Sequence, residues 1–128
     1  MECGIIRSAR AVLHVTDLEA SRAFYVDALG FIETEQKDGC LYLRGLEEHT
    51  HHSLVLKKAE EPVVEVLSYK VGSDADLEAL SERFVSYDHP VEWMEKGTQH
   101  AVGRSFRVQD PAGLPLEFFS EMDHVDRL

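Results

Sequence analysis

The sequence predicts one α+β domain made of two βαβββ units. The 128 residues suit a single compact domain, and no long linker or low-complexity tract divides them. Strand-like and helix-like segments follow one another in the same order in both halves, which we delimit as about residues 9–58 and 62–121. The tetrapeptide Asp17–Ala20 also recurs as Asp76–Ala79, each time near the start of a helical pattern.

The first half should begin with a buried strand at Ala11–Val15 and a helix that runs to about Leu29. Thr16 and Glu19 have the spacing of a capping box, and Gly30 is placed to end the helix. Apolar residues at spacings of four and seven predict its buried face, which comprises Leu18, Tyr25 and Leu29, widened by Ala20, Phe24 and Ala28. Asp38-Gly39 indicates a turn within the three strands that follow, at Phe31–Gln36, Leu41–Leu43 and Ser53–Leu56.

The second half repeats this order. A strand is predicted at Val63–Val71, and Ser73 with Asp76 gives a weaker capping box before a helix. The predicted buried face of that helix is Leu77, Leu80 and Phe84. Three strands follow at Val91–Glu95, Arg104–Val108 and Leu116–Phe119, with Asp110–Gly113 as the last turn.

Composition narrows the class of function. The net charge is −11, from 13 basic and 24 acidic residues, which argues against nucleic acid and against an anionic membrane as partners. No apolar run approaches the ~20 residues of a membrane-spanning helix, and the first ten residues do not resemble a secretory signal. The two cysteines, Cys3 and Cys40, are too few for a disulfide framework and suit free thiols in a reducing compartment. We therefore expect a cytoplasmic protein.

Two sequence segments resemble the vicinal-oxygen-chelate superfamily, which includes glyoxalase I, bleomycin-resistance proteins and extradiol dioxygenases. Val15–Leu18, Ser21–Tyr25 and Ala28–Phe31 look like the opening of one of its modules, and Asp110–Gly113 with Leu116–Phe119 looks like the close. The resemblance spans about residues 9–120. It implies that the paired βαβββ units curl into a half-barrel, a scaffold that carries many different reactions.

A narrower resemblance indicates the reaction. Leu41–Glu48 with His51–Leu56, and the tail Glu121–Leu128, are similar to the first module of homoprotocatechuate (3,4-dihydroxyphenylacetate) 2,3-dioxygenases. In that family two modules lie in tandem on one chain. The second module carries two histidines and one glutamate that hold Fe(II), or Mn(II) in some members. The tail would then be the connector into the second module, so the chain would be a piece of a longer protein.

The resemblance also implies that this module holds no metal. In metal-bearing modules of the superfamily, two histidines and a glutamate come from three strands, because a catecholate and O₂ need open positions beside three protein ligands. The matching positions are Arg10, Val66 and Glu117, so one ligand type of three is present. An Arg10–Glu117 ion pair is the expected arrangement. We therefore assign no catalytic, cofactor-binding or metal-binding residue to this chain, and no cofactor of its own.

The seven histidines are alternative candidates for metal ligands. His14 shares a strand face with Arg10 and could form a different site with Glu117, although a hydrogen-bonded core residue is favoured. His49, His51 and His52 are interpreted as loop and strand-edge residues, because adjacent residues of a strand point to opposite faces and at most His49 and His51 could converge. The isolated residues His89, His100 and His124 are expected to be exposed.

Two functions of different class remain open. The first is the metal-free N-terminal module of an extradiol ring-cleaving dioxygenase, whose partners would be a second module of the same polypeptide and a catechol-type substrate. The second is a free-standing binding protein of the same fold that dimerises to form a site, using its concave sheet with Trp93 or Phe106. In either case apolar surface left without its neighbour predicts a homo-oligomer.

Overall fold

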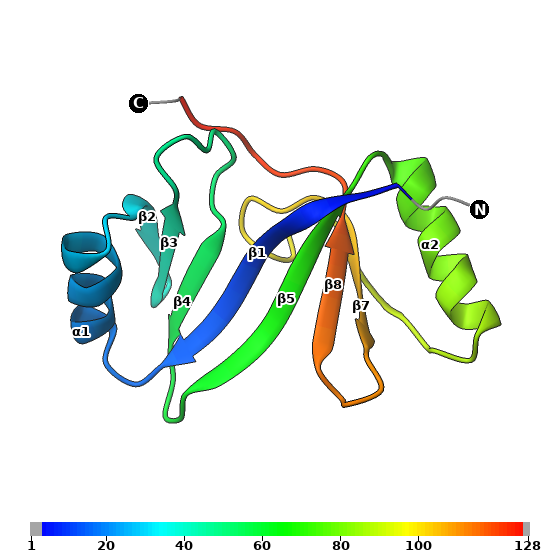
Figure 1. Ribbon diagram of the computed structural model, residues 1–128, viewed down its shortest axis with the longest axis horizontal. Helices are drawn as coiled ribbons and strands as arrows, with labels where there is room; N and C mark the ends of the chain where they lie inside the picture. Colours follow the sequence, from blue (N-terminus) through cyan, green and yellow to red (C-terminus); the bar gives the residue numbers. More distant parts are fainter. Residues whose placement is uncertain (1–3, 127–128) are drawn as a thin grey trace. The chain divides into compact units, whose positions relative to one another are not determined.

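The computed structural model describes residues 4–126, which form two compact units. Unit 1 contains residues up to 9 together with residues 66–123, and unit 2 contains residues 10–65 together with those from 124 on. Each unit combines one helical segment with strands of a mixed sheet (Figure 1). The predicted α+β class and the paired βαβββ units are confirmed.

Unit 2 takes its strands from the first half of the chain. Its strand order is β2-β3-β4-β1, in which β4 runs parallel to β1 and antiparallel to β3, and β3 is antiparallel to β2. The elements are β1 (Ile5–Val15, whose first residues belong to unit 1), α1 (Leu18–Arg22), a π-helical segment η1 (Ala23–Ala28), β2 (Ile32–Lys37), β3 (Cys40–Arg44) and β4 (Leu54–Lys58).

Unit 1 has the same arrangement. Its strand order is β6-β7-β8-β5, in which β8 runs parallel to β5 and antiparallel to β7, and β7 is antiparallel to β6. The elements are β5 (Val63–Val71, whose first residues belong to unit 2), α2 (Asp74–Ser86), β6 (Glu92–Met94), β7 (Ser105–Gln109) and β8 (Pro115–Phe119). No helix within residues 4–126 is both long and apolar enough to cross a membrane.

The predicted capping box at Thr16 is wrong. The N-cap of α1 is Asp17, whose carboxylate accepts a hydrogen bond from the backbone N–H of Ala20 at 3.0 Å. In α2 the predicted cap is correct, because the Ser73 hydroxyl accepts from the N–H of Asp76 at 3.1 Å. Asp17 is therefore a cap whereas Asp76 lies three residues inside its helix, so the repeated tetrapeptide does not occupy equivalent positions.

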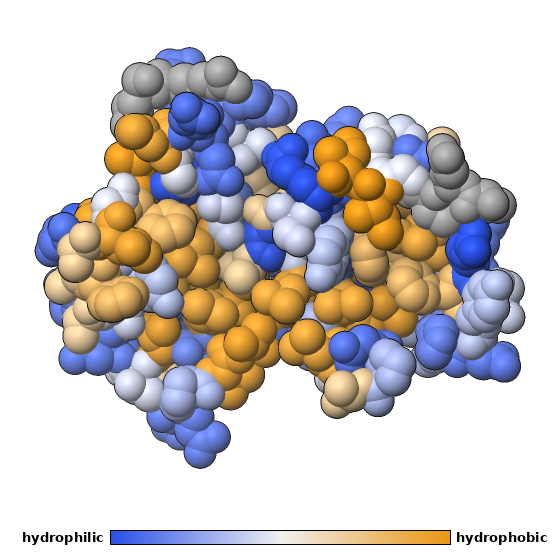
Figure 2. Space-filling model, viewed as in Figure 1, coloured by the Kyte–Doolittle hydropathy of each residue, from blue (hydrophilic) through white to orange (hydrophobic). Residues whose placement is uncertain are grey.

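The first helix buries part of the predicted face, because Leu18 and Tyr25 pack against the core as expected. After Arg22 the backbone widens into the π-helical segment, in which the N–H of Leu29 donates to the carbonyl of Phe24 at 2.9 Å. The wider turn rotates all later side chains relative to the regular helical pattern. Leu29 is consequently 58% exposed, while Val26 packs against the core. Phe24, at the start of this turn, is 59% exposed. Apolar side chains remain at the surface over α1 and η1, at the left of Figure 2.

Each unit has its own apolar core. In unit 2 the core is the inner face of two neighbouring strands, formed by Leu41, Leu43, Leu54 and Leu56. In unit 1 the predicted helix face is confirmed, because Leu77 and Leu80 are buried and pack with Phe84 against β7 and β8. Close-packed strands therefore carry the polar side chains of Arg10, Glu35, Arg107 and Glu117.

Candidate functional site

Buried polar side chains form two networks, one in each unit. The first, which we call the Arg10–Glu35 network, lies in unit 2 and contains Arg10, His52, His51 and Glu35. The second, the Glu117 network, lies in unit 1 and contains Glu117, Arg107 and Gln99.

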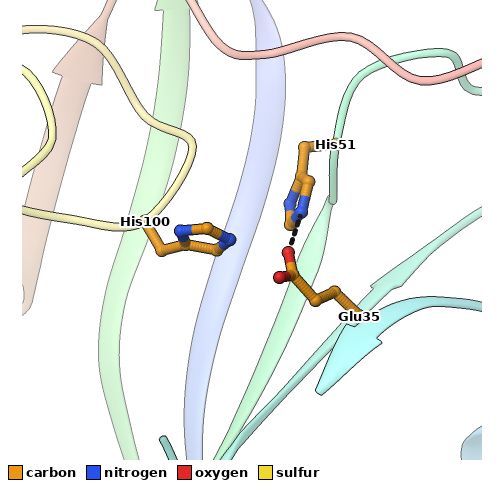
Figure 3. A group of neighbouring side chains, drawn as sticks. All are labelled: Glu35, His51 and His100. Carbon is orange, nitrogen blue, oxygen red and sulfur yellow. Dashed lines mark hydrogen bonds and ion pairs between the residues drawn. The ribbon is translucent and has the colours of Figure 1, made fainter. Parts of the chain in front are cut away.

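The Arg10–Glu35 network is a chain of three hydrogen bonds. Arg10 Nε lies 3.1 Å from His52 Nε2, and the Nδ1 atoms of His52 and His51 are 2.8 Å apart. His51 Nε2 then lies 2.9 Å from Glu35 Oε1, the contact shown in Figure 3. Arg10 and His51 are each 7% exposed and His52 is fully buried, so the chain runs from the interior of the unit to the half-exposed Glu35 carboxylate.

The ends of this chain fix the protons between them. A guanidinium can only donate hydrogen bonds, and a carboxylate can only accept them. His52 must therefore accept at Nε2 and carry its proton on Nδ1. His51 then accepts at Nδ1 and carries its proton on Nε2, which donates to Glu35. Each imidazole has one proton, and a second proton on either ring would place two donors face to face.

Tyr42 lies beside both imidazoles. Its ring centroid is 5.3 Å from that of His51 and 5.0 Å from that of His52. Burial is the main cause that raises the pKa of Tyr42 to about 12, with Cys40 as the next contributor. The phenol is therefore neutral at physiological pH and adds no charge to the network.

We expect nuclear magnetic resonance to find opposite tautomers in the two neighbouring histidines. Long-range proton–nitrogen correlations should place the ring proton of His52 on Nδ1 and that of His51 on Nε2, because the two ends of the network impose one direction. The exposed His89 is the control and should show the mixed tautomers of a solvated ring. Identical tautomers in both rings, or a doubly protonated ring at neutral pH, would contradict this direction.

The Glu117 network is a closed triangle of side chains. Glu117 is fully buried, and its Oε2 accepts from Arg107 Nε at 3.0 Å and from Gln99 Nε2 at 2.9 Å. Arg107 also donates through Nη2 to Gln99 Oε1 at 3.0 Å. A charged pair with a further hydrogen-bond partner is the arrangement in which a buried carboxylate is tolerated.

The positions inferred from the superfamily pattern are all buried. Arg10 is a hydrogen-bond donor in the first network, Glu117 is the acceptor in the second, and Val66 is a fully buried alkyl side chain in β5. Arg10 and Glu117 belong to different units, and the ion pair between them stays a prediction. These three side chains do not fit an Fe(II) or Mn(II) centre, since a guanidinium and an isopropyl group supply no ligand and the carboxylate already contacts a cation.

Two expectations about the histidines are wrong. Residues 51 and 52 lie in the loop before β4, as expected, but their side chains converge instead of pointing to opposite faces, and both are buried. His100 is half-buried and not exposed.

The other histidines follow expectation more closely. His14 makes the expected hydrogen bond, with its Nε2 2.8 Å from Glu65 Oε1, but it is half-buried and not a core residue. His89 and His124 are exposed, and so is the loop residue His49, whose ring stacks on that of His124 with centroids 5.0 Å apart.

Sequence reasoning missed Arg107, Gln99 and Glu35. Arg107 pairs directly with Glu117 across β7 and β8, because the connection between these strands has the five residues 110–114. Counting outward from the predicted four-residue turn at Asp110–Gly113 would place Arg107 opposite Leu116, so the pair does not follow from that turn. Glu35 was not predictable either, because the register between β2 and β3 shifts between Glu33 and Glu35.

Comparison with known proteins gives one family and several relatives. The profile of the Glyoxalase/Bleomycin resistance protein/Dioxygenase superfamily matches residues 7–118. A metapyrocatechase from Pseudomonas sp. (strain CF600) is 29% identical over 99% of this chain and 42% of its own length. A manganese-dependent 2,3-dihydroxybiphenyl 1,2-dioxygenase from Geobacillus genomosp. 3 is 24% identical over 96% of this chain and 39% of its own length.

Solved structures give a higher similarity. Homoprotocatechuate 2,3-dioxygenase from Arthrobacter globiformis superposes with a TM-score of 0.92 and 42% identity, over 98% of this chain and 39% of that one. The enzyme from Brevibacterium fuscum, in its E323L variant, gives the same TM-score with 38% identity over 98% of this chain and 35% of that one. The chain thus spans 35–42% of the length of these proteins.

Proposed function

Since the chain belongs to the Glyoxalase/Bleomycin resistance protein/Dioxygenase superfamily, we propose that it serves as the metal-free N-terminal module of an extradiol ring-cleaving catechol dioxygenase. The similarity to homoprotocatechuate 2,3-dioxygenase carries the proposal, because it covers 98% of this chain but only 39% of that one. The substrate of the whole protein would be a catechol, such as 3,4-dihydroxyphenylacetate, and its main partner would be a second module on the same polypeptide. Self-association of the chain stays a prediction.

The local chemistry supports a metal-free role. The three pattern positions offer one carboxylate, and that carboxylate accepts hydrogen bonds from Arg107 and Gln99. In the Arg10–Glu35 network, both ring nitrogens of His51 and of His52 take part in hydrogen bonds. Fe(II) or Mn(II) would have to displace these bonds. We therefore assign the metal and the reacting diol to the second module.

The experiment is to load the purified chain with Fe(II) or Mn(II), remove free metal, and measure both bound metal and ring cleavage. We expect no stoichiometric metal and no yellow ring-opened product from 3,4-dihydroxyphenylacetate in air. Without a ligand set with open positions, nothing would bind the diol as a chelate or activate O₂. A longer protein that includes what the gene encodes beyond Leu128 should show both bound metal and ring cleavage.

The extended preparation is the positive control for loading, and a matched variant shows whether Glu117 is a ligand if the chain does take up metal. Near-equimolar metal in the chain that is lost in Glu117→Ala would show that unit 1 supplies a ligand, and would overturn the metal-free assignment. If the chain alone forms the ring-opened product continuously and a chelator stops this, the assignment of the metal and the reaction to the second module is wrong. A gene that ends at Leu128 would favour the free-standing binding protein instead.

A further inference from the structure

The C-terminal end of α2 carries a pocket that the proposed function does not use. It has a volume of about 310 Å³ and is lined by Leu80, Arg83, Phe84, Tyr87 and His89. All five residues belong to unit 1 and lie within ten positions of one another in the sequence. The volume is at the lower end of the ~300–1,000 Å³ that small-molecule sites usually occupy.

Backbone hydrogen bonds hold the pocket in shape. Asp88 adopts a left-handed conformation with φ of 64°, which turns the chain back over the end of the helix. The N–H of His89 then donates to the carbonyl of Phe84 at 2.9 Å, and the N–H of Asp88 donates to that of Val85 at 3.0 Å. This pair of bonds is a Schellman motif. The backbone that carries His89 is therefore held in place without a ligand.

The lining is aromatic and carries one permanent positive charge. The rings of Phe84 and His89 meet edge to face, with centroids 6.3 Å apart. Tyr87 is 66% exposed, and the guanidinium carbon of Arg83 lies 6.0 Å from the centroid of its ring. None of the lining residues is acidic, although the whole chain has a net charge of −11. The five lining residues therefore include one permanent cation and no anion.

From this combination we propose that the pocket binds a small planar aromatic carboxylate. The ring would lie among Leu80, Phe84 and Tyr87, where apolar and aromatic contacts stabilise a flat ligand. The carboxylate would lie at the rim beside Arg83, whose planar guanidinium matches a carboxylate in geometry and charge. Arg83 distinguishes an anion from a neutral ring, and the aromatic lining distinguishes a flat ring from a puckered one.

The test is a titration of the nitrogen-15-labelled chain with benzoate, followed through backbone amide shifts. We expect saturable shifts concentrated on residues 80–89, with a dissociation constant of about 1 mM, as befits a ligand of this size. Benzamide, which has the same shape without the charge, and cyclohexanecarboxylate, which has the charge without the flat ring, should each bind about tenfold more weakly. Arg83→Gln should weaken benzoate binding to the level of benzamide.

Two control variants should bind benzoate as the parent chain does. Asp88→Gly keeps the left-handed turn without a side chain, and Arg22→Gln removes an exposed arginine of unit 2. Three results would overturn the proposal: no saturable shift at millimolar benzoate, equal binding of benzoate and benzamide, or full binding by Arg83→Gln. If the same amides shift when the protein is simply diluted, the pocket binds a second copy of the chain. That result would also overturn the proposal.

Discussion

Replacing Arg107 with methionine should lower the free energy of unfolding by about 3 kcal/mol. Glu117 is fully buried, and Arg107 Nε contacts its carboxylate at 3.0 Å. Methionine fills a similar volume but removes the cation. It also removes the hydrogen bond that Arg107 Nη2 donates to Gln99. A buried carboxylate without its cation is destabilising because the protein interior solvates charge poorly. Urea unfolding followed by circular dichroism measures the change.

The matched control also removes the negative charge of Glu117. Glu117→Gln combined with Arg107→Met should recover most of the lost stability, because a neutral amide in the interior needs no cation. The two single variants and the double variant together form a cycle that gives the coupling energy of the pair. A loss below about 0.5 kcal/mol in Arg107→Met would be typical of a surface position. It would mean that this pair does not hold the second half of the chain together.

Replacing His52 with alanine should also cost about 3 kcal/mol, because it removes buried ring atoms and two hydrogen bonds at once. His52 is fully buried and joins Arg10 to His51. Without it the Arg10 guanidinium loses an acceptor, and His51 loses the donor that fixes its tautomer. Unfolding in urea gives the energy, and the ring nitrogens of His51 give an independent spectroscopic reading of whether the network has broken.

His49→Ala is the control for this variant. His49 lies three residues away in the same loop, but it is exposed and stacks on the equally exposed His124. Its replacement should change stability by no more than about 0.5 kcal/mol, as is usual for surface positions. Equal effects of the two replacements would show that the loop as a whole, and not the network, sets the stability.

Most of the fold was predictable from the sequence because its signals are local. Alternating apolar residues, the Ser73 cap, and the turns at Asp38-Gly39 and Asp110–Gly113 each determine a short segment independently of the rest. The π-helical segment was not predictable, because it places one extra residue in a turn and no residue type is specific for it. This is why Leu29 was expected inside and lies outside.

The polar networks were less predictable because they depend on register. The Arg107–Glu117 pair requires a connection one residue longer than the predicted turn at Asp110–Gly113, and the approach of His51 to His52 depends on a bend that has no clear sequence signal. An extended strand would point the side chains of His51 and His52 to opposite faces and would exclude their contact. The same reasoning that places strand side chains correctly therefore fails for His51 and His52, which lie in the loop before β4.

Each unit contains a terminal segment that is distant in sequence from the rest of that unit, and this affects the order in which the units can fold during synthesis. Residues 4–9 belong to unit 1, where the N–H of Gly72 donates to the carbonyl of Gly4 at 2.9 Å. The segment that starts at His124 belongs to unit 2, where the N–H of Val125 donates to the carbonyl of His49 at 2.7 Å. On a ribosome, which releases the chain from its N-terminus, residues 10–65 emerge long before the segment that completes them. Neither unit is complete until residues 119–125 have emerged, so the two units are expected to mature together and not one after the other.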